Sequence, residues 1–357
     1  MIAEPLPAPQ EQPMVAIAIV SFSTSDTEYL AGCLKSLAAS TFPRFRVVIC
    51  ENAGDVGFAR TTEALAGLDV IAPAEASAVP CRHPHRDFRF AASGQAVTVL
   101  KAPGNLGYAG GVNACIAAAG DDWDAVWVLN PDTFPEPDAL TALVRRQQEG
   151  GYGIVGSRLI FVASGLVQTW GGIEWRRLLL RGKLLGTNRP ADTLPDIAEV
   201  ERRIGFIIGA SMYVTRAYIE AIGVMDDDFF VYNEDVDWCL RRGSFKLGYA
   251  HDSVVRHVHG GTTGSSLKKR GRSRFNLYLT ERNRVLLARK RFGRWWGLVA
   301  LLALAQTSEH LLRLRSIRQF RIALDGWWSG IRGETGAPYF LREQRFFDAG
   351  ALRKAES

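Results

Sequence analysis

The sequence predicts an α/β protein that is built on a doubly wound sheet and ends in a helical C-terminal appendage. Three observations lead to this prediction. Short apolar, β-branched runs alternate with segments of helical periodicity in the first half of the chain, a glycine-rich segment follows one of these strands and opens a helix, and the pattern becomes helical from residue 273 onward. Strands that alternate with helices are typical of a sheet with helices on both faces.

Four strands and three helices are expected between residues 15 and 148. The run VAIAIVS has the composition of a buried parallel strand, and Leu30, Leu34 and Leu37 then recur at helical spacing. Strands are expected at residues 15–21, 46–51, 97–101 and 125–130, with helices over these leucines and at residues 109–119 and 136–148. Residues 66–95 are rich in alanine, proline and histidine without clear periodicity, so we expect a loop insertion there.

Shorter elements are expected in the second half of the chain. Strand-like segments cover residues 153–160, 204–208 and 249–257, with a basic loop around 176–189, a turn and helix within 223–242 and a flexible glycine/serine stretch at 260–266. The expected organisation is a disordered lead-in at residues 1–13, an α/β domain at 14–266 and a basic, mainly helical region at 267–357.

The composition also predicts a cellular setting. Five cysteines without a CxxC pair suggest neither a disulfide framework nor a zinc knuckle. The acidic, proline-rich N-terminal segment lacks the basic and apolar regions of a secretory signal. The longest apolar run, residues 295–305, holds 11 residues, whereas a bilayer span needs roughly 20. We therefore expect a cytoplasmic protein without a transmembrane helix.

Charge is distributed unevenly along the chain. Residues 267–357 contain 20 Lys and Arg against 7 Asp and Glu, whereas residues 1–266 contain 23 against 30. A basic tail beside an acidic body fits nucleic acid or an anionic membrane. Tryptophans and leucines are interleaved with the arginines, which favours the membrane because an interfacial helix needs an apolar face. The alternative is that Trp295, Trp296 and the leucines pack internally while the arginines are solvated.

Polar residues that follow the predicted strands are the first candidates for a binding site. Ligands of an open α/β sheet bind beyond the carboxyl ends of its strands. Such ends are found at Ser21, at Glu51 and Asn52, and at Asn130 and Asp132. Asp132 is a candidate ligand for a hard divalent cation that bridges two phosphates; its alternative role is a turn aspartate that caps the next helix.

The segment GNLGYAGGVN, residues 104–113, follows a strand and opens a helix. Its glycines would let the backbone approach a diphosphate at the helix N-terminus, or would only allow tight packing of the helix on the sheet. The sequence has neither the GxGxxG pattern of dinucleotide-binding proteins nor a GxxxxGK[ST] P-loop.

Two further clusters contain side chains suited to catalysis. Glu234, Asp235 and Asp237 open a predicted helix after an aromatic turn, where they are candidates for a general base or serve as N-terminal caps. His257 and His259 lie two residues apart in an extended segment, so both point the same way. Each histidine is a candidate metal or phosphate ligand, although a lone histidine at a strand end is more often structural.

Taken in order, these motifs resemble the family 2 glycosyltransferases, and within them the bacterial rhamnosyltransferase-like and galactofuranosyltransferase-like enzymes. The resemblance covers residues 14–290 and rests on the motifs IAIVSFS, GNLGYAGGVN, VLNPDT, the block from IIGASMYV to NEDVDWCLR, VVRHVHGG and YLTERNR. It implies the GT-A nucleotide-diphospho-sugar transferase fold, a Rossmann-like mixed sheet.

The resemblance also implies roles for individual residues. Asp132, with Asn130 in the first position of a DxD-like motif, would hold Mn²⁺ or Mg²⁺ against the donor diphosphate, with His257 or His259 as the metal-side histidine. Asp235 would be the general base. The nucleotide-sugar would lie against Ser21, Glu51, Asn52, Asn105, Gly107, Gly110, Gly111, Asn113, Asn130, Glu234 and Arg241. Glu51 replaces the family's usual aspartate, which leaves the choice between UDP- and dTDP-sugars open.

The implied reaction is an inverting, metal-dependent transfer of a rhamnose-like or other hexose. The acceptor would be a hydroxyl of a lipid-linked or polysaccharide substrate in cell-surface glycan synthesis, and the enzyme would be peripheral on the inner face of the membrane. Nucleic acid is not an expected partner, and the oligomeric state is left open. A sugar-nucleotidyltransferase is disfavoured because it would carry a glycine-rich, Arg-containing loop after the first strand. A non-catalytic carbohydrate-binding or scaffold protein would not need Asp132, Asp235 and a histidine together.

Overall fold

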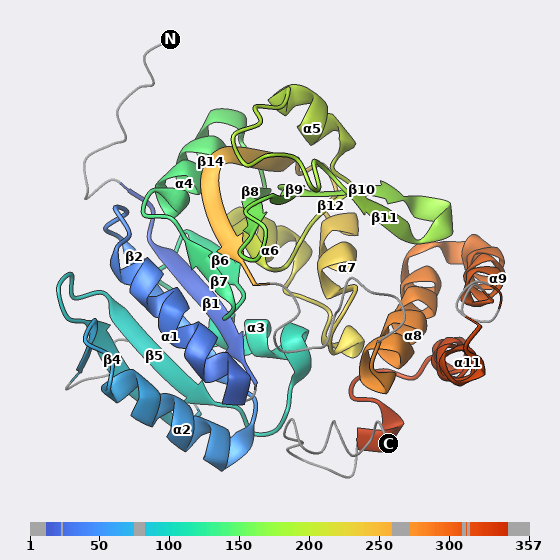
Figure 1. Ribbon diagram of the computed structural model, residues 1–357, viewed down its shortest axis with the longest axis horizontal. Coiled ribbons are helices and arrows are strands. Elements are labelled where there is room, and N and C mark those ends of the chain that lie inside the picture. Colours follow the sequence, from blue (N-terminus) through green and yellow to red (C-terminus); the bar gives the residue numbers. More distant parts are fainter. Residues whose placement is uncertain are drawn as a thin grey trace.

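The computed structural model of the protein describes residues 12–22, 24–74, 83–258, 272–308, 312 and 315–341. An eleven-stranded mixed sheet runs through the molecule, and helices lie on both of its faces (Figure 1). Its strands follow the order β3-β4-β5-β2-β1-β6-β13-β8-β14-β7, with β9 paired to β8. The predicted α/β class and the C-terminal helices are confirmed.

The N-terminal half forms the parallel part of the sheet. Its elements are β1 (Val15–Ser21), α1 (Thr24–Ala38), β2 (Phe45–Glu51), α2 (Gly54–Ala66), β3 (Ile71–Pro73), β4 (His85–Phe90), β5 (Ala96–Lys101), α3 (Gly107–Ala118), β6 (Ala125–Leu129), β7 (Thr133–Pro135) and α4 (Ala139–Gly150). Strands β5, β2, β1 and β6 are parallel, and Ser21 pairs with Glu51 in register. The carboxyl ends of these strands therefore meet at one edge.

The second half adds antiparallel strands and a smaller sheet. Its elements are β8 (Ile154–Phe161), β9 (Val167–Trp170), β10 (Gly172–Arg176), η1 (Arg177–Leu179), β11 (Arg181–Leu184), α5 (Ile197–Arg203), β12 (Phe206–Ile207), β13 (Ser211–Thr215), α6 (Arg216–Ile222), η2 (Asp227–Phe229), α7 (Glu234–Leu240) and β14 (Leu247–His257). Strands β11, β10 and β12 form the second sheet. The pairing of β14 with β7 brings His257 opposite Thr133, next to Asp132.

Two segments that were expected to be loops contain strands. Residues 66–95 include β3 and β4, which extend the sheet by antiparallel pairing, while residues 75–82 lie outside the described part. In β4 the side chains alternate between exposed and buried, so Phe88 and Phe90 reach the core although the segment is polar overall. The basic loop at 176–189 contains η1 and β11, which pairs with β10.

The C-terminal region packs directly on the α/β core. It consists of α8 (Arg274–Arg291), η4 (Gly293–Trp295), α9 (Trp296–Thr307), α11 (Ile317–Arg332) and η5 (Tyr339–Leu341). Leu286, Leu287 and Val299 belong to the same buried cluster as strands β1 and β6. Within the part of the chain described here, no helix combines the length and the apolar character needed to cross a membrane.

Candidate functional site

The candidate site lies at the edge where the parallel strands end. Ser21 is fully buried, and its hydroxyl has no hydrogen-bond partner among the described residues. Glu51 is also buried; one of its carboxylate oxygens accepts from the amide of Ala53 at 2.9 Å and the other from the Thr61 hydroxyl at 2.8 Å. One Glu51 oxygen therefore bonds to the residue before α2 and the other to Thr61 near the middle of that helix.

The glycine-rich segment is connected to this edge and to a turn before α7. Asn52 donates from Nδ2 to the carbonyl of Gly107 at 2.8 Å and accepts the amide of Leu106. The Asn105 side chain accepts the amide of Gly107. The next two amides, of Tyr108 and Ala109, both donate to the carbonyl of Phe230. The first amides of α3 are thus bonded within the protein and not left open to a diphosphate.

Three glycines of α3 are required by close packing. A Cβ on Gly107 would lie 2.3 Å from the Phe230 carbonyl oxygen, and Gly107 also has a φ of +71°. A Cβ on Gly111 would lie 2.7 Å from the side chain of Val20 in β1, and one on Gly110 would lie 2.9 Å from Leu106. Asn113 binds both the amide and the carbonyl of Met225. These contacts fix α3 between the sheet and the turn.

A buried carboxylate–histidine pair lies beside the end of β6. The Asp132 Oδ1 and His257 Nε2 atoms are 3.3 Å apart, and both side chains are less than one-tenth exposed. On the other side of the ring, His257 Nδ1 lies 2.8 Å from Gln168 Oε1, a carbonyl oxygen that only accepts. With the Gln168 amide in this orientation Nδ1 donates, and in the neutral ring the lone pair of Nε2 then faces the Asp132 carboxylate. A carboxylate oxygen and a ring nitrogen in this arrangement are donors that could hold a cation together.

Tyr108 connects this pair to the acidic residues of α7. Its hydroxyl lies 2.8 Å from both Asn130 Oδ1 and the carbonyl oxygen of Gly209. The amide of Gly209 in turn donates to Asp235 Oδ2 at 3.2 Å. Burial raises the pKa of Tyr108, and the charges of Glu234, Asp235 and Asp132 raise it further. The two ends of the candidate site are therefore adjacent.

Glu234 and Asp235 form an acidic wall with little access to water. Asp235 accepts from the amides of Gly209 and Val236. Glu234 is 5% exposed, and its Oε2 has no hydrogen-bond partner among the described residues. Burial raises the pKa of both carboxyl groups, and for Glu234 the charge of Asp235 adds to this effect. A carboxylate with a raised pKa is suited to accept a proton near neutral pH.

The third acid of the cluster is neutralised by arginines. Asp237 is fully buried between Arg241, whose Nε lies 2.8 Å from Oδ2, and Arg291 of α8, which contacts Oδ1. The remaining Arg241 nitrogens donate to the carbonyls of Ile222 and Val224. Arg241 thus binds Asp237 and the protein's own backbone. Arg291 pairs with Asp237 and is therefore not a solvated residue of a basic tail.

We predict that Arg291→Met will destabilise the fold. Removing one arginine leaves part of the Asp237 charge unpaired in the interior, and breaking a buried pair costs roughly 3–5 kcal/mol. Arg241 remains, so the loss in the free energy of unfolding should be at the lower end of that range. Chemical denaturation measures it, with Arg294→Met as the exposed control. An unchanged midpoint for Arg291→Met would contradict the pairing.

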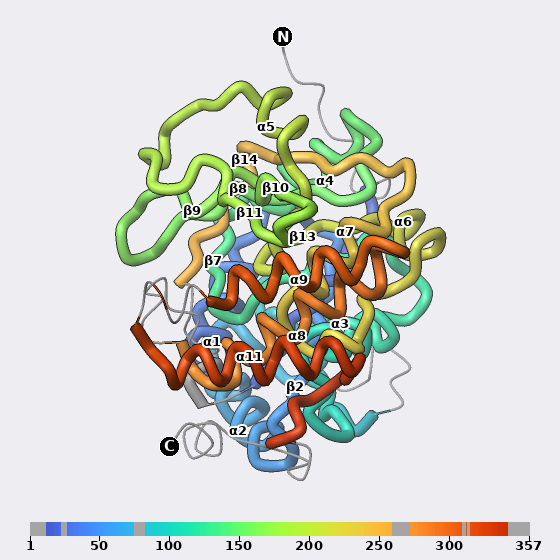
Figure 2. The backbone as a smooth tube through the Cα atoms, turned by 90° about the vertical axis from the view of Figure 1, so that its right-hand side faces the viewer, coloured from blue at the N-terminus to red at the C-terminus, as the bar shows by residue number. Residues whose placement is uncertain are grey.

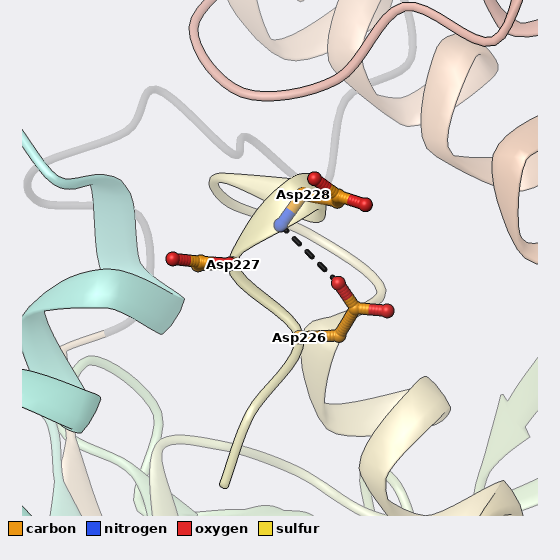
Figure 3. Close-up of side chains that lie close together, drawn as sticks. All are labelled: Asp226, Asp227 and Asp228. Atoms are coloured by element: carbon orange, nitrogen blue, oxygen red, sulfur yellow. Dashed lines mark hydrogen bonds between the residues drawn. The ribbon is translucent and has the colours of Figure 1, made fainter.

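A second acidic group lies in the turn between α6 and α7. The carboxylate oxygens of Asp226, Asp227 and Asp228 approach within 4.8 Å of one another. Figure 3 shows Asp227 extending to one side of the turn and Asp226 and Asp228 to the other. Lys290 of α8 lies 2.7 Å from Asp226 and 2.6 Å from Asp228, and Arg291 lies 3.4 Å from Asp226, so two of the three carboxylates already have cationic partners.

Sequence reasoning did not identify two side chains of the site. Tyr108 was hidden in the glycine-rich motif, and its position in the first turn of α3 was the available signal. Gln168 lies on β9 and is brought to His257 by the pairing of β8 with β9 and β14, which no local pattern indicates. His259 falls outside the described residues.

Comparisons with known proteins find glycosyltransferases. The family model described as "Glycosyl transferase family 2" matches residues 86–223, which include Asp132. A hexosyltransferase of low-salt glycan biosynthesis from Haloferax volcanii, Agl10, is 24% identical over 242 residues, which are 66% of this chain and 76% of the relative. An N-acetylglucosaminyl-diphospho-decaprenol L-rhamnosyltransferase from Mycobacterium tuberculosis is 28% identical over 260 residues, covering 63% of this chain and 78% of the relative.

The fold is also similar to that of a solved glycosyltransferase. The crystal structure of GalNAc-T7 with UDP, GalNAc and Mn²⁺ superposes with a TM-score of 0.55 at 12% identity. The match covers 94% of this chain and 57% of that one. At this identity the likeness concerns the fold.

Proposed function

Because the chain is a glycosyltransferase with a family 2 domain, we propose that it transfers a hexose, with inversion, from a nucleoside-diphosphate sugar to an acceptor hydroxyl. The observation that carries this proposal is the pair formed by Asp132 and His257, which lies on the same hydrogen-bonded path, through Tyr108 and Gly209, as Asp235. A pair that could hold a cation and a half-buried carboxylate are two devices that a displacement at an anomeric carbon can use.

Asp132 and His257 are the residues that would hold the divalent cation, Mn²⁺ or Mg²⁺. Their side chains are buried, the Oδ1 and Nε2 atoms lie 3.3 Å apart, and Gln168 contacts the other ring nitrogen and so orients the ring. When bound there, such an ion would offset the charge on the departing diphosphate. The cluster at Asp226–Asp228 is a poorer candidate because Lys290 already pairs with two of its carboxylates.

Asp235 is proposed as the general base. It takes the proton of the acceptor hydroxyl while the hydroxyl oxygen attacks the anomeric carbon and the bond to the diphosphate breaks, so no covalent enzyme intermediate is needed. The amides of Gly209 and Val236 hold its carboxylate. Tyr108 and Asn130 lie between the base and the cation site. Ser21, which ends β1, is proposed to lie on the nucleotide side of the donor.

The acceptor class is proposed from the relatives. The mycobacterial relative is named for a lipid-linked, diphospho-decaprenol acceptor, and the Haloferax relative for glycan synthesis. A lipid-linked or polysaccharide acceptor in cell-surface glycan synthesis is therefore our proposal for this chain, with a dTDP- or UDP-sugar as donor. A panel of nucleotide-sugars, assayed for release of nucleoside diphosphate, tests the donor class.

Membrane association is proposed for the face formed by η1, α9 and α11. Figure 2 shows α9 and α11 on the same side of the molecule, and the Trp327 indole donates to the carbonyl of Ala300 between them. Large apolar side chains are at least half exposed on these elements and η4: Leu178, Trp295, Leu298, Leu301, Ile317 and Trp328. Arg294, Arg318 and Arg321 are exposed on the same segments. Apolar side chains with arginines suit an anionic lipid surface.

We predict that Leu298→Ser/Leu301→Ser will weaken flotation with anionic liposomes by on the order of tenfold or more, because each leucine loses its transfer into the interface. Trp296 is partly buried against the core and carries the Arg289 guanidinium over its ring, so Trp296→Ala should mainly lower the melting temperature. Leu194→Ser, at an exposed leucine elsewhere, is the matched control. Equal flotation of the double variant and the wild type would refute the membrane proposal.

A further inference from the structure

The turn that precedes Asp235 has an unusual backbone. Phe230, Tyr232 and Asn233 all have φ between 66° and 72°, and they are three of the six non-glycine residues with positive φ in the described chain. Side chains with a Cβ rarely adopt this region, so such a turn persists only where its surroundings fix it. Asn233 is the N-cap residue of α7, and Asp235 follows two positions later.

Asn283 of α8 holds this turn from the C-terminal side. Its side chain is fully buried, and its Nδ2 lies 2.8 Å from the carbonyl oxygens of Phe229 and Val231 and 2.7 Å from that of Tyr232. The two hydrogens of one amide group are thus shared among three carbonyls of this segment. Its Oδ1 accepts from Arg282 Nε at 2.9 Å, which orients the amide so that the nitrogen faces the turn.

Arg282 reinforces the same contact. It is fully buried and donates to the carbonyl of Phe229 at 3.1 Å and to that of Gly336 at 2.6 Å. On the opposite side of the turn, the carbonyl of Phe230 accepts from the amides of Tyr108 and Ala109 in α3. The turn is therefore clamped between α3, which carries Tyr108, and α8.

We propose that Asn283 is a positioning residue: by holding the left-handed turn at residues 230–233, it fixes where α7 begins and so where the Asp235 carboxylate lies. This inference rests on the proposed role of Asp235 as the base. It assigns the ERNR segment of α8 to the catalytic apparatus, although Asn283 itself touches no substrate.

The test is the steady-state kinetics of Asn283→Ala. Displacement of a catalytic group by about 1 Å can cost on the order of 10²-fold in rate, so kcat should fall by about 10- to 100-fold while the donor KM stays within about threefold. Val285→Ala, at a buried neighbour that packs on α11 and α9, is the stability-matched control. It should lower the melting temperature and retain wild-type kcat in assays run well below that temperature.

A double variant separates this inference from the proposed base. In an Asp235→Asn background, Asn283→Ala should lower kcat little further, because both changes act on the same group. If the two substitutions lower kcat by factors that multiply in the double variant, the positioning role is wrong. A wild-type kcat in Asn283→Ala would also overturn it. If Asp235→Asn itself keeps wild-type kcat, the base assignment fails, and the positioning role fails with it.

If Asn283→Ala does not fold, the turn can be probed from Asn233. Asn233→Ala makes the left-handed conformation unfavourable, whereas Asn233→Gly permits it without a steric penalty. A larger loss of kcat in the alanine variant than in the glycine variant, at equal donor KM, is the expected result. Equal kcat values in the two variants would overturn the inference.

Discussion

Replacement of Asp235 by asparagine is expected to lower kcat by a factor of about 10²–10⁴, because loss of a general base typically costs that much. Asparagine keeps the shape and does not take a proton, but its single amide oxygen can accept from only one of the Gly209 and Val236 amides, which donate to different oxygens of Asp235. Binding of the donor should be retained, which a titration with the nucleoside diphosphate and Mn²⁺ measures. A variant with near wild-type kcat would show that Asp235 is not the base.

The neighbouring acids provide contrasting controls. Asp237 lies between Arg241 and Arg291, so Asp237→Asn should chiefly lower the melting temperature. Glu234→Gln removes a charge that burial already disfavours, since its pKa is raised first by burial and then by Asp235. We expect a smaller loss of kcat in Glu234→Gln than in Asp235→Asn. The reverse order would make Glu234 the base.

The pH dependence follows from the same burial. Burial raises the pKa of Asp235, and only the ionised carboxylate accepts a proton. Activity should therefore be full above the raised pKa and decline as the pH falls through it. In Asp235→Asn this acid limb should disappear from the residual rate. An acid limb that persists unchanged would assign it to another group.

Removal of the divalent cation is expected to abolish transfer. Turnover should vanish with EDTA and return with Mn²⁺ or Mg²⁺, and Asp132→Ala should lose most activity even at high Mn²⁺. Binding of Mn²⁺, followed by electron paramagnetic resonance in the presence of nucleoside diphosphate, should weaken in the same variant. Full turnover in chelator would contradict the proposed cation site.

Gln168 provides a graded test of the same site. Loss of a partner that orients a metal-binding histidine typically costs 10–100-fold in metal affinity, so Gln168→Leu should raise the Mn²⁺ concentration needed for half-maximal activity by about that factor. Saturating Mn²⁺ should restore most of kcat. If the variant needs the same Mn²⁺ concentration as the wild type, Gln168 does not contribute to cation binding through the orientation of the His257 ring.

The sequence was informative wherever a pattern is local. Strands β1, β2, β5 and β6 are apolar runs of the length that a buried parallel strand needs, so their positions could be predicted. Strand β4 was missed because it is polar overall and contributes only alternate phenylalanines to the core. Its alternation was the signal that could have identified it.

The site was predictable only in part, because its contacts join distant segments. Asp132 and His257 could be proposed from their motifs. The orientation of the His257 ring toward Asp132 depends on Gln168, which no local sequence pattern connects to either residue. From the numbers of charged residues in the sequence, Lys290 and Arg291 were expected to belong to a basic tail. Both pair with buried or half-buried aspartates of the turn and of α7, which only tertiary packing determines.

We propose that Asp132, His257 and Asp235 form one centre for glycosyl transfer. The most direct measurement incubates the purified full chain with dTDP-, UDP- and GDP-sugars and Mn²⁺ and follows the release of nucleoside diphosphate, in parallel with Asp132→Ala and Asp235→Asn. We predict release from at least one dTDP- or UDP-sugar, abolished by EDTA and strongly reduced in both variants. Release that continues at the wild-type rate in both variants would contradict the claim.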